Sequence, residues 1–295
     1  MRLITRADLD GLTCAILLSE VEQIDKVDFA HPKDVQDGKV EVTGDDILAN
    51  LPYDERAALW FDHHVSQADF SWNANMRGAY DIAPSAARVI ANHYKSPKFE
   101  RFQNLLEETD RLDAAILTKD DIVDPQGWIL VGYTLDPRTQ LPRYQDYFRH
   151  VMALAKTQTP EQVLQDPEVK SRVDAMRAQE VAFLEHLKAD SRIDKNVIIT
   201  DLRGKGTPAT GNRFLIYTLF PEGNVSMRIA DGYGGEVVSI QLGHSILNRT
   251  CHTNVGDLLA EYGGGGHEGA GTAQPAKADA DRVISEILAT LHKNG

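Results

Sequence analysis

The sequence has few cysteines, no long apolar run and little positive charge for its size. Cys14 and Cys251 are the only cysteines among 295 residues, so we expect reduced thiols in a cytoplasmic protein, not a disulfide framework. No apolar run approaches the roughly 18 residues of a membrane span, and the first residues do not fit a signal peptide. We therefore expect no membrane partner.

The balance of charged residues indicates which kind of nucleic acid or nucleotide the protein can bind. Lys and Arg number 31 against 44 Asp and Glu, which gives a formal net charge of −13. A protein that grips a long duplex through its phosphates usually presents a basic face. The composition therefore argues against long duplex nucleic acid, but it leaves room for a small anionic substrate held beside metal ions.

The hydrophobic pattern predicts an α/β fold with two domains and a connector. Met1–Thr5 resembles a buried strand, and an acidic loop and a helix over Leu12–Ile24 follow it, as in the first unit of a parallel sheet. Lys39–Thr43 is a further strand candidate, and the alternating stretch Arg213–Phe220 is another. We predict a parallel-sheet domain over residues 1–150, a helical linker over 151–195 and a smaller α/β domain over 196–295.

The stretch Ala58–Ser66, ALWFDHHVS, is the most informative part of the chain. An apolar strand ends there at three consecutive polar side chains, Asp62, His63 and His64. Ligands of open α/β sheets bind at the carboxyl ends of the strands. Carboxylate and imidazole together suit divalent first-row metals such as Mn²⁺. The alternative is a surface tripeptide without a ligand.

Further acids follow other predicted elements of the same domain. They are Asp8 and Asp10 after the first strand, Asp45 and Asp46 after Lys39–Thr43, and Asp110 and Asp113 after a predicted helix over Phe99–Thr109. One member of the first pair is explained by a helix N-cap, but a cap needs only one carboxylate. Each acid alone has solvation as its ordinary explanation. As a set they provide the several carboxylates that a pair of metal ions requires.

The second half of the chain carries features typical of phosphate binding. Four glycines, Gly263–Gly266, precede His267, and such a run lets backbone N–H groups approach an anion. The alternative is a flexible hinge. Arg228 lies in a predicted strand, and His244, Asn248 and Arg249 follow the next one. Guanidinium matches phosphate geometry, with surface salt bridges as the alternative.

Taken in order, these motifs resemble the DHH phosphoesterase superfamily. They are Asp8-x-Asp10-Gly11, Asp62-His63-His64 and the GGGGHEGAG stretch over residues 263–271. The stretches NLPY, LWFDHH, APSAARV and DPRT resemble the exopolyphosphatase-related, oligoribonuclease-like branch. The resemblance implies a DHH catalytic domain followed by a DHH-associated substrate-binding domain. Ile4 stands where many members of the superfamily have a histidine.

The resemblance also implies a cofactor and a site. Two Mn²⁺ ions are expected, with Mg²⁺ or Co²⁺ as substitutes. The implied metal ligands are Asp8, Asp10, Asp46 (with Asp45 as the alternative), Asp62, His63, and either Asp110 or Asp113. His64 would be a ligand or a substrate contact, and it would act with Asp62 in catalysis. Arg228, His267 and the glycines Gly264, Gly265 and Gly266 match the substrate-binding motifs.

The predicted activity is metal-dependent hydrolysis of short oligonucleotides, above all linear dinucleotides, to mononucleotides. Alternative enzyme activities are those of a 3′-phosphoadenosine-phosphate phosphatase, a cyclic-dinucleotide phosphodiesterase, and an exopolyphosphatase or pyrophosphatase. A non-catalytic nucleotide sensor is a hypothesis of a different class, motivated by Ile4 at the histidine position. A homodimer is compatible with the sequence, which does not determine the oligomeric state.

Overall fold

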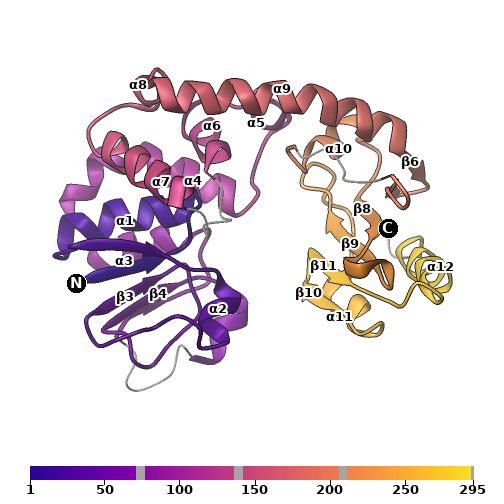
Figure 1. Cartoon of the computed structure of the whole chain (residues 1–295), viewed down its shortest axis with the longest axis horizontal. Helices are drawn as coiled ribbons and strands as arrows, with labels where there is room; N and C mark the ends of the chain where they lie inside the picture. The colour runs from indigo at the N-terminus through magenta and orange to yellow at the C-terminus, as the bar shows by residue number, and fades with distance from the viewer. Residues whose placement is uncertain (71–76, 136–141, 206–210, 294–295) are drawn as a thin grey trace. The chain divides into compact units, whose positions relative to one another are not determined.

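A computed structural model of the chain describes residues 1–70, 77–135, 142–205 and 211–293 (Figure 1). The chain forms two compact units. The first comprises Met1–Ile116 and Pro125–Val173, and the second comprises Leu117–Asp124 and Asp174–Gly295. The division falls inside the long helix α9 (Pro167–Asp190), so the predicted linker over 151–195 contributes to both units. The DPRT stretch lies outside the described residues.

The first unit is built on a five-stranded sheet in the order β2-β1-β3-β4-β5, and every neighbouring pair is parallel. The strands are β1 (Arg2–Thr5), β2 (Lys26–Phe29), β3 (Asp46–Ala49), β4 (Leu59–Asp62) and β5 (Gly78–Tyr80). The central strand β3 is buried along its whole length, as expected of a parallel sheet with covered faces. The predicted parallel sheet is thus confirmed.

The helices up to residue 190 belong to the first unit, except the short helix Lys119–Val123 and the larger part of α9, which belong to the second (Figure 1). They are α1 (Leu9–Val21), α2 (Pro32–Gln36), α3 (Ala86–Tyr94), α4 (Gln103–Asp113), α5 (Lys119–Val123), α6 (Gly127–Thr134), α7 (Pro142–Ala155), α8 (Pro160–Val163) and α9, with short 3₁₀ turns η1 (Val65–Phe70) and η2 (Pro97–Phe102). Residues Leu9–Leu18 of α1 are all buried, so α1 is a core helix. Within the described ranges, every helix is too short or too polar to cross a bilayer.

The second unit holds a six-stranded mixed sheet in the order β10-β11-β9-β8-β7-β6. Its elements are β6 (Ser191–Asp194), β7 (Val197–Asp201), α10 (Leu215–Leu219), β8 (Val225–Asp231), η3 (Tyr233–Gly235), β9 (Val238–His244), α11 (Val255–Ala260), β10 (Gly265–His267), β11 (Ala270–Ala273) and α12 (Ala280–Leu291). Apolar residues of α11 and α12 pack on one face of the sheet. The strand predicted over Arg213–Phe220 is wrong, because the buried Leu215, Ile216 and Tyr217 lie in helix α10.

Asp46 lies at the start of β3, not after a strand. Lys39–Thr43 forms no strand, and the third strand begins at Asp46 itself. Arg2 is its register partner on β1 and donates from Nε to Asp46 Oδ1 at 2.8 Å and from Nη2 to Oδ2 at 2.7 Å. Because the strands are parallel, this pair lies at the opposite edge of the sheet from Asp62, the last residue of β4. The prediction of Asp46 as a metal ligand is therefore wrong.

The Arg2–Asp46 pair predicts a pH-dependent contribution to stability. Burial would raise the pKa of Asp46, but the hydrogen bonds from Arg2 and Thr43 outweigh it and hold that pKa below its usual value. The pair therefore stabilises the fold above the unfolded-state pKa of about 3.9, and this contribution is lost as the pH falls through the lower folded-state pKa.

We expect Asp46→Asn to lower the free energy of unfolding by about 2 kcal/mol at neutral pH. The difference from the wild type should shrink as the pH falls below about 4. Urea unfolding across this pH range measures both effects. A difference that stayed constant with pH would contradict the assignment of the ion pair.

Candidate metal centre

The carboxyl ends of β1, β3 and β4 bring the DHH stretch beside the starts of α1 and α3 and the end of α4. Two groups of potential metal ligands meet there. One is Asp62, His63 and His64, and the other is Asp10, His63 and Asp113. Within each group one ligand atom per residue lies within 4.8 Å of the others. His63 belongs to both groups, so it links them into one centre.

Asp10 is held by the first turn of α3. Ala86 N donates to Asp10 Oδ2 at 2.9 Å and Ala87 N to Oδ1 at 2.8 Å, so the carboxylate sits on a helix N-terminus. Cys14 Sγ approaches Oδ1 at 3.6 Å. Burial raises the pKa of Asp10 to about 7, and the negative charge of Asp113 adds to this increase. Each oxygen keeps a further lone pair for a cation.

His63 presents a defined ring nitrogen to these acids. Its Nδ1 lies 2.9 Å from Ala83 O, and since a carbonyl only accepts, Nδ1 carries the proton. Nε2 then faces Asp113 Oδ2 at 3.2 Å and Asp10 Oδ2 at 3.9 Å. Burial lowers the pKa of His63, but the contacts with Asp113 and Asp10 outweigh it and raise that pKa to about 9. Metal-binding histidines are typically oriented by such a carbonyl.

Asp62 and His64 form the other side of the centre. His64 Nδ1 lies 2.8 Å from Asp62 Oδ1, and Asp62 is 1% exposed. The backbone carbonyl of His64 accepts a hydrogen bond from the Tyr80 hydroxyl at 3.2 Å. Because Nδ1 is engaged by Asp62, Nε2 is the nitrogen of His64 that remains for a ligand or a proton.

Asp8 combines a structural contact with proximity to the centre. It is the N-cap of α1 and accepts from Gly11 N at 2.9 Å. Arg6 Nε lies 3.2 Å from its other oxygen, and burial raises the pKa of Asp8. A side chain on Gly11 would meet Arg6 O at 1.9 Å, so only glycine allows this close approach. The cap needs Asp8 alone, which leaves Asp10 unexplained by capping, as the sequence indicated.

Asp110 and Asp113 have different surroundings. Both lie in the last turn of α4, which extends four residues beyond the predicted end of this helix at Thr109. Asp110 accepts from Ser85 Oγ at 2.6 Å and from Arg88 Nε at 2.8 Å, so it ties α4 to the N-terminus of α3. Asp113 faces His63 instead. The structure thus brings Asp113 to the centre and gives Asp110 a supporting contact.

Four buried polar atoms at this edge have no hydrogen-bond partner within the described residues. They are Thr5 Oγ1, Asn50 Oδ1, Asp62 Oδ2 and His63 Nε2. Buried polar atoms are nearly always satisfied, so a cluster of unsatisfied ones is typical of a ligand-binding site. Carboxylate, imidazole and amide oxygen are ligands that Mn²⁺ and Mg²⁺ accept. The residues present therefore fit a divalent metal centre.

Sequence reasoning missed Asn50, Arg6 and the Ala83 carbonyl. Asn50 immediately follows β3, and a correct placement of that strand would have exposed it as the polar residue at the strand end. Arg6 lies in the loop before Asp8, and its position two residues from Asp8 could have indicated a contact between the two side chains. The role of the Ala83 carbonyl cannot be predicted from the sequence, because every residue has a backbone carbonyl.

In the second unit, strand register places two predicted substrate residues on one face. Arg228 pairs with Gln241, and Gln241 pairs with Thr272. Two residues further along each strand, Ser226 and His267 belong to the next row, which links them through Gly243 and Ala270. Alternation along the strands therefore puts Arg228 and His267 on the sheet face opposite α11 and α12.

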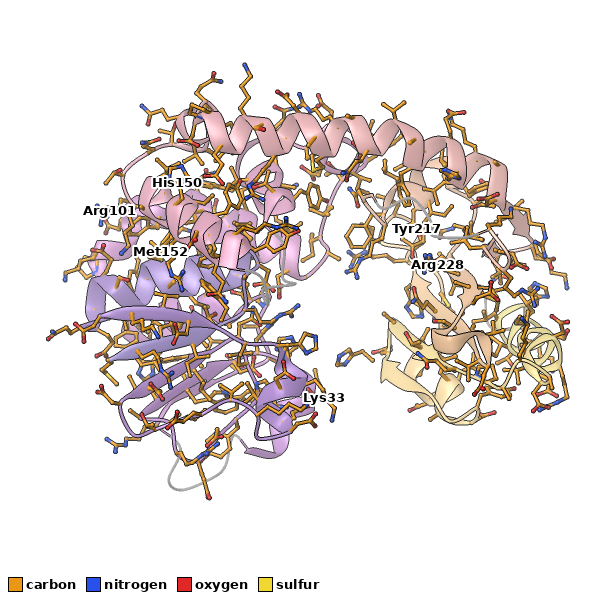
Figure 2. The ribbon with its side chains drawn as sticks, in the orientation of Figure 1. Lys33, Arg101, His150, Met152, Tyr217 and Arg228 are labelled. Atoms are coloured by element: carbon orange, nitrogen blue, oxygen red, sulfur yellow. The ribbon has the colours of Figure 1, made fainter. Side chains whose placement is uncertain are left out.

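Arg228 has the character of an anion-binding residue. Its Nη1 contacts Gln241 Oε1 at 3.3 Å, and burial lowers the pKa of its guanidinium. In the described part of the chain, no carboxylate forms an ion pair with it, and burial alone shifts its pKa. Tyr217, which is labelled with Arg228 in Figure 2, bonds Ser226 Oγ at 2.9 Å on the neighbouring row. An arginine without an acidic partner is suited to a phosphate.

The other predicted substrate residues have structural contacts. His244 follows the alternation of the core-facing residues of β9, away from Arg228, and its Nε2 lies 2.8 Å from Thr253 O. Asn248 Nδ2 donates to Glu222 O at 3.1 Å, and Arg249 Nε donates to Ile246 O at 3.1 Å. These contacts account for the three residues, and their binding of substrate stays a prediction.

The glycine run leads from a turn at Gly263 into strand β10, which contains Gly265 and Gly266. A Cβ on Gly264 would lie 2.3 Å from Thr272 O, and one on Gly266 would lie 2.3 Å from Ala270 O. Close pairing with β11 therefore requires glycine at both positions. Gly265 lies between them with open space at its Cβ position, in the row of Arg228. Binding of substrate by these glycines stays a prediction.

The whole chain is similar to a solved enzyme structure. It is 38% identical to a pGpG-specific phosphodiesterase, PggH, from Vibrio cholerae, with a TM-score of 0.85 and coverage of 100% of this chain and 99% of that chain. The chain therefore belongs to the DHH phosphoesterase superfamily, a class of metal-dependent phosphoesterases. No protein-family model and no curated protein sequence matches it.

A more distant similarity is to RecJ in complex with Mn²⁺ from Thermus thermophilus. The identity is 13% and the TM-score is 0.48, with coverage of 99% of this chain and 52% of that chain. This likeness is too low to bear on activity.

The contrast between Asp113 and Asp110 gives a test of the centre. We expect Asp113→Asn to weaken Mn²⁺ binding about tenfold or more, because it removes a charge beside His63 Nε2. Asp110→Asn should act mainly on the melting temperature, since it weakens the contact with Arg88. Calorimetric titration with Mn²⁺ and thermal unfolding of the metal-free variants separate the effects. Equal losses of Mn²⁺ affinity in both variants would contradict the assignment.

Proposed function

We propose that the chain is a divalent-metal-dependent phosphodiesterase that hydrolyses short linear dinucleotides to mononucleotides. The observation that carries the proposal is the pair of overlapping carboxylate–imidazole groups that share His63 at the carboxyl edge of the sheet. Such a shared ligand set suits two adjacent divalent ions. Full-length similarity to a pGpG-specific phosphodiesterase supports the choice of a dinucleotide.

The residues of the first unit divide into two roles. Asp8, Asp10, Asp62, His63 and Asp113 would hold the ions, which we propose to be Mn²⁺, with Mg²⁺ or Co²⁺ as substitutes. When bound, the ions would lower the pKa of a water molecule and neutralise the charge that develops on the phosphoryl oxygens.

His64 would orient the substrate or transfer a proton at Nε2. The contact of its Nδ1 with Asp62 fixes the ring orientation and the tautomer, as required of a general acid or base. Ala83 does the same for His63 through the bond to Nδ1, so that Nε2 stays directed at the acids. This part of the proposal thus assigns different work to two adjacent histidines.

Arg228 would bind a phosphate group of the substrate. Its guanidinium is half-buried beside Gln241 and lies on the sheet face opposite α11 and α12. His267 lies exposed on the same face and would provide a second contact with the anion. Recognition of a terminal phosphate favours a short substrate with a defined end. The net charge of −13 favours the same conclusion, because proteins that bind long nucleic-acid strands usually carry an excess of positively charged residues.

Hydrolysis of a substrate panel with Mn²⁺ tests the proposal. The panel comprises pGpG and other 5′-phosphorylated dinucleotides, a 5-mer, a cyclic dinucleotide, 3′-phosphoadenosine phosphate and polyphosphate. We expect mononucleotides to appear fastest from the dinucleotides, and chelation of the metal to stop the reaction. Turnover of polyphosphate alone would replace the proposal with phosphoanhydride hydrolysis. Nucleotide binding without any turnover would support a sensor.

A matched pair of histidine variants ties the activity to the centre. His63→Ala should reduce kcat by at least about a hundredfold, because it removes the residue shared by both ligand groups. His186→Ala is the control, since His186 lies exposed on α9 and its Nδ1 is 3.8 Å from Asp190 Oδ2, outside the metal centre. Equal activity of the two variants would exclude the centre as the site of chemistry.

Arg228 predicts an effect on substrate affinity. We expect Arg228→Ala to raise KM for pGpG about tenfold or more, a loss typical of one charge-assisted contact, with a smaller change in kcat. Arg282→Ala is the control, because Arg282 is exposed on α12 and pairs with Glu286 and Asp279. Steady-state kinetics at saturating Mn²⁺ measures both. An unchanged KM in Arg228→Ala would remove the residue from the substrate site.

A further inference from the structure

Asn50 occupies a position of unusual backbone conformation at the edge of the metal centre. It is the first residue after β3, and its N–H donates to Phe61 O on β4 at 3.0 Å. Its φ of +56° lies in the left-handed region, which asparagine tolerates better than most residues and glycine tolerates best. A purely conformational need would therefore be met by glycine. The side chain calls for a separate explanation.

The amide of Asn50 is fixed by Asp8. Nδ2 donates to Asp8 Oδ1 at 3.1 Å, and the residue is 1% exposed. The opposite orientation of the amide would set its oxygen against a carboxylate oxygen, which excludes it. The bond to Asp8 thus determines that Oδ1 is the other, free end. That atom is buried and, within the described residues, has no hydrogen-bond partner.

We propose that Asn50 Oδ1 is a neutral ligand of the divalent metal centre on the side of Asp8, an inference that rests on the proposed function. Amide carbonyl oxygen is a hard ligand suited to Mn²⁺ and Mg²⁺. The sequence had led us to expect a carboxylate, Asp46, in this role, but Asp46 is at the other edge of the sheet. Asn50 supplies an oxygen without supplying a charge.

The neutral ligand has a consequence for affinity. Arg6 already balances part of the charge of Asp8, with Nε 3.2 Å from Oδ2. An ion on this side is therefore held by fewer net negative charges than an all-carboxylate set would give. The inference predicts that this ion binds more weakly than the one beside Asp62 and that an added carboxylate at position 50 would tighten it.

Two substitutions with opposite expectations test the inference. Asn50→Gly suits the left-handed backbone but removes the oxygen, and it should weaken the binding of one Mn²⁺ about tenfold or more. Asn50→Asp keeps an oxygen and adds a charge, and it should bind that ion more tightly than the wild type. Without metal, Asn50→Asp should melt at a lower temperature than the wild type, since its carboxylate would face that of Asp8. Mn²⁺ should reverse this loss.

Calorimetric titration with Mn²⁺ and melting curves in chelator and in Mn²⁺ provide the readouts for the full chain. Lys95→Gly is the control, because Lys95 has a similar left-handed φ of +48° at the end of α3, away from the centre. It should bind Mn²⁺ as the wild type does.

Different results would disprove the role of Asn50 and the proposed function. Wild-type Mn²⁺ stoichiometry and affinity in both Asn50 variants, with changes only in the metal-free melting temperature, would show a structural role and overturn the inference while pGpG hydrolysis stood. If the wild type bound no divalent metal, the proposed function would fail together with the inference.

Discussion

The contact between Asp10 and the N-terminus of α3 is the constraint on which the centre depends. A carboxylate removed from water needs compensating hydrogen bonds, and the amides of Ala86 and Ala87 provide one for each oxygen. Because Asp10 belongs to α1, this contact joins the first crossover helix to α3. The start of α3 then fixes Ser85 against Asp110, and the preceding Ala83 carbonyl orients His63.

Much of the fold could be predicted from sequence because hydrophobic periodicity reports burial directly. The strand before Asp62, the acidic turn after β1 and the parallel sheet are all visible in this way. The errors arose where local pattern and tertiary environment disagree. Lys39–Thr43 has strand-forming residues but pairs with no strand of the described residues, and β3 begins three residues later. Leu215–Leu219 alternates only by chance, because its apolar residues pack as a helix.

The candidate site was likewise predicted only in part from the sequence. Asp10 and the Asp-His-His stretch were found because their chemistry and their place at strand ends coincide. Asp46 was predicted to follow a strand over Lys39–Thr43. It is instead the first residue of β3, so it lies at the opposite end of the strands from Asp62. Asn50 was not predicted as a ligand, because the predicted ligands were all aspartates and histidines and its amide is uncharged. The choice between Asp110 and Asp113 needed side-chain directions on α4, which spacing of three residues cannot give.

The most direct test of the account is anomalous diffraction from crystals of this chain grown with Mn²⁺. We expect Mn²⁺ peaks at coordination distance, about 2.0–2.3 Å, from His63 Nε2 and Asp62 Oδ2, two of the buried atoms that lack a hydrogen-bond partner within the described residues. Peaks at neither atom, in a protein that hydrolyses pGpG under the same conditions, would contradict the account. The chemistry would then have to be sought at another part of the chain.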